Sequence, residues 1–506
     1  MRVYPVLVSL DGYPVGGGEI DTQPERYATG LENSDHPATS DPATLSTLRV
    51  MALAAVTVLA VWVGDIGVAL LAAGVVALLI RARWIALALV LLSAIGVLRA
   101  DQAWTALAPD ALGEYHGWAR VVDDPQPYPG STRVILELDG ERFEFWSRGR
   151  AQQLRVREWR GGEWVAVSGF RNALDAQRAG RVAWQHVVGD FELEWASDVD
   201  VGDPVARASN RVRASIERAA THLPADDGAL FRGLVVGDDR DQPREMIERF
   251  RASGLSHLTA VSGQNVSFLL AAAGPLLRRL RPWMRWAVTI GLIAWFVALT
   301  RYEPSIVRAG AMAGLSATAF VLGRERSPVR ILAVAVIGLV LVDPLLVWSV
   351  GFWLSVGATL GVSGAGPWIA SRLARFGRVG IFALPIGVTL GAQLGVVIPS
   401  VLVFGRLPLM SIPANLLAVP VAGFVMLYGM PAGLVAGWVP AVAPILMFPA
   451  RLGTRWVDTV AVLGARLEPD PPAQVVGWGV VAVSVVVLLA ISRNTARSHG
   501  DLSPDR

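Results

Sequence analysis

Residues 254–266, GLSHLTAVSGQNV, carry the side chains of this chain best suited to chemistry. The segment opens an apolar stretch, yet it contains four polar residues: His257, Ser262, Gln264 and Asn265. Ionisable and amide groups are costly inside a membrane and usually face a bundle interior or a water-filled path. Irregular, glycine-containing backbone at membrane depth is tolerated where it lines a cavity. The segment therefore indicates a conduit or a binding site rather than a simple anchor.

Further polar and aromatic side chains interrupt the apolar stretches that follow. Taken alone, Arg308 or Asp343 could reach a membrane interface, and an isolated amide could hydrogen-bond between two helices. Their occurrence on several stretches instead favours a polar lumen shared by several helices. Besides the first four residues, the candidates for its lining are Arg308, Asp343, Phe352, Trp353, Ser355, Gln393 and Asn415.

His257 and Ser262 also suggest a hydrolase, with Ser262 as nucleophile and His257 as base. Five residues separate them, which places them about 140° apart around an ideal helix. No G-x-S-x-G sequence surrounds Ser262, so an intramembrane serine hydrolase is the weaker interpretation. The six histidines are scattered, and the chain has no cysteine and no Walker A motif. We therefore expect no metal, no cofactor and no enzymatic activity on this chain.

The composition is typical of a membrane protein. The 506 residues are 53% hydrophobic and 17% charged, with a mean hydropathy of +0.46, which is too apolar for an ordinary soluble domain. All 45 basic residues are arginine, and a guanidinium group can bind phosphate with two hydrogen bonds. The net charge of +3 is too small to imply nucleic-acid binding by itself.

The apolar stretches predict a polytopic α-helical membrane protein with about 12 spans. Three lie within residues 48–100. The others, within 256–492, are predicted at 256–277, 284–300, 305–322, 328–342, 345–364, 381–403, 408–437, 439–466 and 473–491. Arg451, Arg455 and Asp458 interrupt 439–466, which could therefore be re-entrant or lie in the interface.

Arginine placement agrees with one threading of these spans through an inner membrane. The clusters assigned to the cytoplasm are Arg81/Arg83, Arg278/Arg279/Arg281/Arg285, Arg324/Arg326/Arg330, Arg372/Arg375/Arg378 and Arg493/Arg497. This threading places both termini in the cytoplasm. Residues 1–47 are expected to be a disordered tail and residues 493–506 a cytoplasmic tail.

Residues 101–203 change character and predict a small β domain outside the membrane. Apolar and polar residues alternate at 132–138, 142–146, 163–168 and 184–188, with Pro-Gly, Asp-Gly and Gly-Gly turns between them. This pattern suits a small barrel of the oligonucleotide-binding (OB) type. Residues 204–255, which follow, read as soluble or interfacial helices.

Arginines and aromatic residues interleave in the β domain, as sequence-tolerant binding of a single nucleic-acid strand requires. The residues predicted to guide such a strand are Arg133, Arg142, Trp146, Arg148 and Arg150. A solvated arginine face over an aromatic core would give the same pattern, and nearby glutamates dilute the charge. Both interpretations stay open from the sequence.

Four motifs stand in the order found in one known family. They are Gly254, Leu255, His257, Leu258, Ala260, Ser262 and Gly263 (G-L-x-H-L-x-A-x-S-G); Arg308, Ala309 and Met312 (R-A-x-x-M); Asp343, Pro344 and residues 351–355 (D-P…G-F-x-L-S); and Asn415, Leu416 and Pro420 (N-L-x-x-x-P). With these motifs the chain resembles the ComEC family of competence membrane proteins, from the first spans to about residue 440.

The resemblance implies a channel that carries one DNA strand through the inner membrane during transformation. It also implies a cytoplasmic helicase-like ATPase, an extracytoplasmic DNA receptor and contact with membrane lipid, and a homo-oligomer is an option. Many family members carry a C-terminal metallo-β-lactamase-like domain. Here a short polar segment without a metal motif follows the last predicted span, so we expect strand degradation to need a separate protein. Asn265 stands where many members have histidine.

A secondary transporter of a small anionic solute is the alternative function.

Overall fold

The computed structural model describes residues 42–80, 83–259, 263–324, 327–375, 380, 382–405, 407–470, 472–474, 476–481, 483–484 and 487. Residues 49–506 form one compact unit. Ser262, most of the predicted N-terminal tail, the tail 493–506, much of the last predicted span and Arg81, Arg326, Arg378, Arg493 and Arg497 of the arginine clusters lie outside the described residues.

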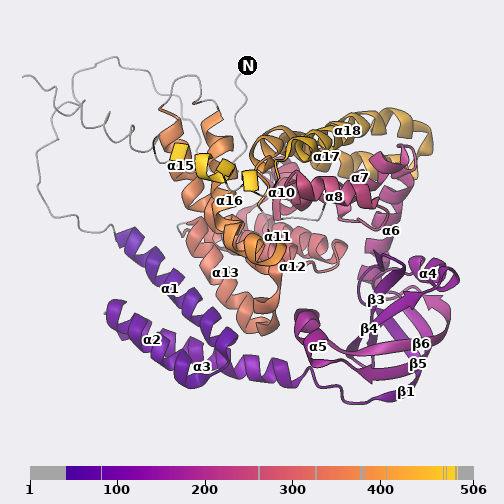
Figure 1. The fold of residues 1–506 in the computed structure, drawn as a ribbon, viewed down its shortest axis with the longest axis horizontal. Coiled ribbons are helices and arrows are strands. Elements are labelled where there is room, and N and C mark those ends of the chain that lie inside the picture. The colour runs from indigo at the N-terminus through magenta and orange to yellow at the C-terminus, as the bar shows by residue number, and fades with distance from the viewer. Residues whose placement is uncertain are drawn as a thin grey trace, which may run out of the picture. The chain divides into compact units, whose positions relative to one another are not determined.

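Three helices open the described chain: α1 (Pro42–Val63), α2 (Ile66–Ile80) and α3 (Arg83–Thr105) (Figure 1). Small residues let them approach closely, because Ala60, Ala69 and Val97 form one buried cluster. Leu89 of α3 is fully buried in a neighbouring cluster with Val56 and Ala73. These helices correspond to the three apolar stretches expected within 48–100.

The strands form a small barrel over residues 113–200. They are β1 (Gly113–Val121), β2 (Gln126–Tyr128), β3 (Ser131–Leu138), β4 (Glu141–Arg148), β5 (Trp164–Ala173) and β6 (Val187–Asp200). The sheet order is β1-β5-β6-β4-β3-β2, and an additional β1–β3 pairing closes a ring of five strands. Every pairing is antiparallel except β4–β6. Phe143, Phe191 and Leu136 fill its interior.

The strands expected at 132–138, 142–146 and 163–168 are confirmed as parts of β3, β4 and β5. The strand expected at 184–188 is wrong at its start. Residues Ala183–Gln185 form a short 3-10 helix, η1, and β6 begins at Val187. Between them His186 adopts a left-handed conformation with φ 59°, which a pattern of side-chain alternation cannot reveal.

The helices that follow β6 form what we call the helical body. They are α6 (Pro204–Ala220), α7 (Ala225–Val236), α8 (Arg244–Ala252), α9 (Ser256–Thr259), α10 (Gly263–Leu277), α11 (Pro282–Leu299), α12 (Pro304–Val321), α13 (Pro328–Val342), α14 (Val350–Ser363), α15 (Ala365–Leu373), α16 (Ala383–Phe404), α17 (Ser411–Trp438) and α18 (Ala443–Leu467), with the 3-10 turns η2 (Pro344–Trp348) and η4 (Pro440–Val442). Helices α6 to α8 share one buried core with α17 and α18, centred on Phe231, Leu234 and Phe250.

Within the described residues, four helices are long and apolar enough to cross a membrane: Trp84–Thr105, Pro282–Leu299, Ala383–Val403 and Ser411–Trp438. The expected number of about 12 is therefore only partly supported. The stretch 345–364 begins as the 3-10 turn η2, so α14 covers only Val350–Ser363 of it. A continuous helix of this length is shorter than a hydrocarbon core requires.

The doubtful stretch 439–466 is mostly one helix, α18, and its charges have partners. Arg249 of α8 lies 2.7 Å from the Asp458 carboxylate, and Arg455 lies 3.1 Å from Asp227 of α7. In the sequence these charges count against a membrane span. In the structure they form the ion pairs that join α18 to α7 and α8.

Glycines pack α14 and α15 against α16 at backbone contact. A Cβ added at Gly361 would overlap the carbonyl oxygen of Gly391, and one added at Gly395 would overlap that of Gly357. Gly357 and Gly361 on α14, and Gly391 and Gly395 on α16, are four residues apart, and small residues at this interval let two helices approach this closely. Because no side chain stands between the helices, these positions cannot accept even a methyl group without moving the backbone.

We expect Gly361→Ala to lower the free energy of unfolding by about 1–3 kcal/mol or more, because the added methyl group forces α14 away from α16. The matched control is Gly338→Ala on α13, where a Cβ would meet nothing within 4 Å and alanine favours helix by about 0.5–1 kcal/mol. Thermal unfolding of both variants in lipid nanodiscs measures the difference. Equal midpoints would contradict the close approach of the two helices.

Candidate functional site

Arg308 brings together three of the four sequence motifs. Its side chain leaves α12, is 4% exposed and donates from Nε to the Ser355 hydroxyl at 2.8 Å. Its Nη1 donates to Thr359 Oγ1 at 3.0 Å, and its Nη2 also donates to Ser355. Ser355 and Thr359 share one face of α14 because they are four residues apart. The guanidinium group therefore rests on neutral hydroxyl groups.

The start of α10 packs directly against this group. A Cβ added at Gly263 would lie 2.9 Å from Ala309 Cβ and 3.3 Å from Arg308 Nη2. The Ala309 contact is too short for a real Cβ, so glycine at this position lets α10 approach α12 closely. The first motif thus meets the second at Gly263, while Ser262 lies outside the described residues.

Gln393 and Asn415 form a second polar group around Ser411. Gln393 Nε2 of α16 donates to Ser411 Oγ at 3.0 Å, and Asn415 Nδ2 donates to the Ser411 carbonyl at 2.6 Å. A Cβ added at Gly254 would lie 2.5 Å from Ser411 Cβ, and Gly254 has φ +73°. Both the conformation and the contact require glycine at that position.

The two polar groups lie on opposite sides of the glycine-packed helix pair. Ser355 stands two residues before Gly357, and Gln393 two residues before Gly395, so each polar side chain points about 160° away from its glycine. The contacts of the described residues include no hydrogen bond between the groups. A single lumen lined by both polar groups stays a prediction. In such a lumen the helix pair α14 and α16 would stand between the two groups.

The amide of Asn265 ties α10 to α7. Its Nδ2 donates to the Leu234 carbonyl at 3.2 Å, and its side chain is buried. Gln264 beside it is half-buried, and His257 of α9 is exposed. The structure therefore gives Asn265 a packing role, whereas the His257 imidazole hydrogen-bonds the backbone of Gly254.

Asp343, Phe352 and Trp353 have structural contacts. Asp343 caps the turn η2 by accepting from the Leu345 amide at 3.1 Å, and its other oxygen lies 3.1 Å from Nε2 of His186 on the barrel. Phe352 is fully buried in a core with α13 side chains. The Trp353 indole donates to the Val347 carbonyl at 2.7 Å.

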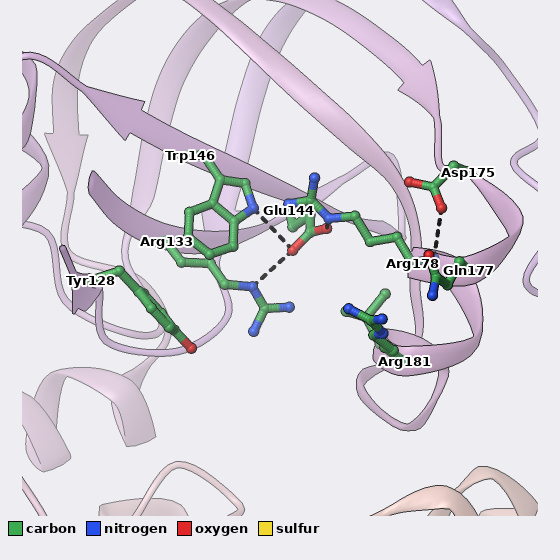
Figure 2. A pocket seen from close by; sticks show the side chains of 9 residues that line it. Tyr128, Arg133, Glu144, Trp146, Asp175, Gln177, Arg178 and Arg181 are labelled. Atoms are coloured by element: carbon green, nitrogen blue, oxygen red, sulfur yellow. Dashed lines mark hydrogen bonds and ion pairs between the residues drawn. The ribbon is translucent and has the colours of Figure 1, made fainter. Parts of the chain in front are cut away.

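A pocket of about 470 Å³ opens on the barrel face formed by β2, β3, β4 and α5 (Ala176–Val182) (Figure 2). It is lined by Tyr128, Arg133, Glu144, Trp146, Asp175, Gln177, Arg178, Arg181 and Val182. The Arg178 guanidinium lies over the Trp146 ring, 5.3 Å from its centroid. The Tyr128 ring is 5.1 Å from the same indole. An aromatic platform therefore stands beside cationic side chains.

Glu144 is the buried anchor of this pocket. Its carboxylate pairs with Arg133 at 2.8 Å and with Arg178 at 2.6 Å, and it accepts from the Trp146 indole at 3.2 Å. Arg133, 7% exposed, is thus neutralised rather than free. Two arginines on one glutamate hold the platform in place.

Of the five predicted DNA-guiding residues, Arg133 and Trp146 line the pocket. Arg142 donates to the Gln185 carbonyl at 3.1 Å, and Arg148 and Arg150 are exposed outside the lining. Tyr128, Arg178 and Arg181 also line the pocket and were not predicted from the sequence. A signal existed for the two arginines, since residues three apart on a helix share a face.

A buried ion cluster joins the barrel to the helical body. Asp124, which follows β1, lies 2.6 Å from Arg213 of α6 and 2.9 Å from Arg301, which follows α11. It also accepts from the Gly161 amide at 2.9 Å. Burial alone would raise the pKa of Asp124, but the charges of Arg213 and Arg301 hold that pKa well below its usual range. The cluster was not anticipated from the sequence.

Comparison with known proteins accounts for the motifs. A family model described as "Competence protein" matches residues 234–496, about half of the chain. The chain belongs to this family. The match begins within α7 and covers both polar groups, whereas the barrel lies outside it. Together with the apolar helices, membership of the competence protein family makes the chain a membrane protein.

Three curated relatives are similar to this competence family member. It is 26% identical to the uncharacterized protein YcaI of Escherichia coli over 68% of this chain and 47% of that protein. It is 30% identical to the ComE operon protein 3 of Bacillus subtilis over 40% of this chain and 26% of that protein. It is 27% identical to the competence protein ComA of Neisseria gonorrhoeae over 43% of this chain and 36% of that protein. The matched parts thus span less than half of each relative. No solved structure is a significant match.

We expect Asp123→Asn to flatten the pH dependence of stability between about pH 4 and pH 6. Burial, and then the neighbouring Asp124 charge, raise the pKa of Asp123 from 3.8 to about 6. In that interval the folded state keeps a proton that the unfolded chain has released, so the free energy of unfolding falls as pH rises. Thermal unfolding at a series of pH values measures the slope.

Asp124→Asn serves as a control, because it replaces a carboxyl group whose pKa is shifted in the opposite direction. Because the pKa of Asp124 is lowered, its contribution is present above about pH 4 and is lost only in stronger acid. The variant should therefore lose about 3–5 kcal/mol at every pH tested, through an unpaired buried arginine. An unchanged slope in Asp123→Asn would refute the proton on Asp123.

Proposed function

We propose that this protein serves DNA uptake in transformation, as a multi-pass inner-membrane conduit for a single strand with the barrel outside the membrane and both termini inside. The observation that carries the proposal is the barrel pocket, because it places an indole beside three guanidinium groups, two of them held by Glu144 and the third that of Arg181. Base stacking on aromatic rings tolerates any sequence, and arginines follow the phosphates. The family membership supports the same function.

The position of the pocket supports an OB-like barrel. In the five-stranded ring, β3 and β4 are the second and third strands, β2 lies in the connection after the first, and α5 lies in the connection before the last. OB barrels bind oligonucleotides and oligosaccharides on these strands and with these two connections. The lining holds three arginines and two acidic residues, a net charge of +1. This balance suits a phosphate-bearing ligand.

In this proposal the strand passes from the barrel to a path lined by residues of the helical body. Arg308, Ser355 and Gln264 are the strongest described candidates, because they are not explained by core packing. Asp343, Phe352 and Asn265 are explained by their structural contacts. The chain supplies no enzymatic step in the proposal, and a cytoplasmic helicase-like ATPase would pull the strand that an extracytoplasmic receptor delivers.

A transporter of a small anionic solute is the second candidate. It is favoured by the hydroxyl groups around Arg308, which could receive one small anion. Uptake of labelled DNA and of labelled organic anions in the same gene-deletion strain separates the two functions.

Trp146→Ala should weaken binding of a thymidine oligonucleotide by about 1–3 kcal/mol, or about 5- to 150-fold. The matched control is Trp195→Ala on β6, an indole that is 55% exposed outside the pocket lining. Arg181→Gln should lower the slope of log affinity against log salt by about 0.7. Fluorescence anisotropy with the full chain in nanodiscs measures all three. Equal losses for Trp146→Ala and Trp195→Ala would move the binding site away from the pocket.

Deletion of the gene should abolish transformation of its host, and the wild-type gene should restore it. The measurement is transformant frequency per recipient cell with a selectable marker, beside conjugation of the same marker as a control for recombination. Normal transformation without the gene would rule out the proposed function.

A further inference from the structure

Gln185 connects the barrel pocket to the rest of the molecule. It is the last residue of the 3-10 helix η1 and is half-buried. Its side-chain oxygen accepts from Nη2 of Arg133 at 2.6 Å, and its carbonyl oxygen accepts from Nη1 of Arg142 at 3.1 Å. Two arginines of the barrel therefore hold this one residue, and one of them, Arg133, lines the pocket (Figure 2).

The hydrogen bond to Gln185 occupies a donor that a phosphate group needs. Nε of Arg133 donates to a carboxylate oxygen of Glu144 at 2.8 Å, so Nη1 and Nη2 form the edge that remains for a ligand. A phosphate group binds such an edge best with two oxygens at once. It therefore has to compete with the Gln185 amide oxygen for Nη2. The bond from Arg133 to Gln185 thus opposes tight binding in the pocket.

The next residue, His186, links the same turn to the helical body. Its Nε2 lies 3.1 Å from Oδ2 of Asp343. Its backbone is left-handed, with φ 59°, a conformation that is unfavourable for most side chains and persists only where the surroundings hold it. Because Gln185 and His186 are consecutive and share this strained turn, a movement of one displaces the other.

Asp343 is itself held in place from two sides. Arg99 of α3 donates to the carbonyl oxygens of the two residues before Asp343, at 3.0 and 2.9 Å. The other oxygen of Asp343 caps η2 by accepting from the Leu345 amide at 3.1 Å, and α14 follows η2. Asp343 therefore restrains His186, and through the chain it restrains Gln185.

We propose that Gln185 is an autoinhibitory contact of the pocket, kept on Arg133 by the contact between His186 and Asp343. The ligand is a phosphate of the strand, so the inference rests on the proposed function. A strand that binds tightly has to remove Gln185 from Arg133, which pulls on His186 and weakens its contact with Asp343. Such a coupling acts in both directions. A change in the helical body that releases His186 therefore raises the affinity of the pocket.

The test measures binding of a fluorescent thymidine oligonucleotide to the full chain in nanodiscs by fluorescence anisotropy. Gln185→Ala removes the competing oxygen and should bind about 5-fold tighter than the wild type or more. His186→Asn keeps a residue type that tolerates the left-handed backbone, but its side chain is too short to reach Asp343. It should bind tighter by a similar factor.

The double variant separates a coupled restraint from two independent effects. Once Gln185 is replaced, the release of His186 has nothing left to free, so Gln185→Ala/His186→Asn should bind no tighter than Gln185→Ala. Gln152→Ala is the matched control. The side-chain oxygen of Gln152 accepts from the Arg148 amide at 3.2 Å, outside the pocket lining, so its loss should leave the affinity unchanged.

Hydrogen exchange gives a second readout, which a merely structural Gln185 would not change. The oligonucleotide should speed the exchange of the η2 amides in the wild type, because Asp343 loses one of its partners when the strand binds. In Gln185→Ala the strand no longer has to displace a competitor. The oligonucleotide should therefore leave the exchange of the same amides unchanged in that variant.

Two results overturn the proposal while the wild type still binds the oligonucleotide, and they leave the proposed function standing. If Gln185→Ala or His186→Asn binds no tighter than the wild type, Gln185 supports the pocket instead of opposing it. If the two single changes add up in the double variant, His186 does not act through Gln185. A wild type that fails to bind the oligonucleotide refutes both this proposal and the binding role of the pocket in the proposed function.

Discussion

Charges withdrawn from water must be neutralised inside the protein, and this constraint organises the fold. Asp124 lies between Arg213 and Arg301, so one carboxylate from the barrel connects two separate parts of the helical body. The charges of α18 meet partners on α7 and α8, which joins that helix to the core around Phe231. Each cluster fixes an orientation that apolar packing alone would leave less specific. Against this background the neutral surroundings of Arg308 stand out.

The junction around Asp124 also carries unusual backbone. Arg301 and Tyr302 are consecutive non-glycine residues with positive φ, 59° and 56°, a conformation that costs energy in each. Nη2 of Arg301 donates both to Asp124 and to Asn210 Oδ1 at 2.6 Å. Those bonds offset the strained turn between α11 and α12. The turn thus brings the Arg301 guanidinium to Asp124 of the barrel.

The sequence predicted elements whose causes are local. Alternation identified β3, β4 and β5, because this pattern repeats along one segment. Contacts between segments that are distant in the sequence produce no repeated pattern in either segment. Asp124 is 89 residues from Arg213 and 177 from Arg301. Nothing in the sequence around one of these residues identifies the others as its partners. The left-handed backbone of His186 delays the start of β6 to Val187. The side-chain types in this stretch do not reveal that conformation.

The candidate site shows the same division. Arg308, Gln393 and Asn415 were predicted as site residues because they are polar residues within apolar stretches. Ser355 was predicted with them and belongs to one of the family motifs. The sequence could not show that Thr359 completes the partners of Arg308, although its position four residues after Ser355 on one helix was available. It also could not show that Asp343 contacts the barrel or that Phe352 is core. For such residues, polarity and aromaticity identify a constraint without saying whether packing or ligand binding imposes it.

Helix α14 combines the rigid and the chemical requirements of the site. One face carries Gly357 and Gly361, locked to the α16 backbone, and the opposite face carries Ser355 and Thr359 against Arg308. Because side chains are absent from the glycine contact, α14 has little freedom to shift toward α16. The hydroxyl groups are therefore held at fixed positions and cannot easily withdraw from the guanidinium group. A ligand that passes this site would have to displace or share those hydrogen bonds one at a time, while the helix pair behind them stays in place.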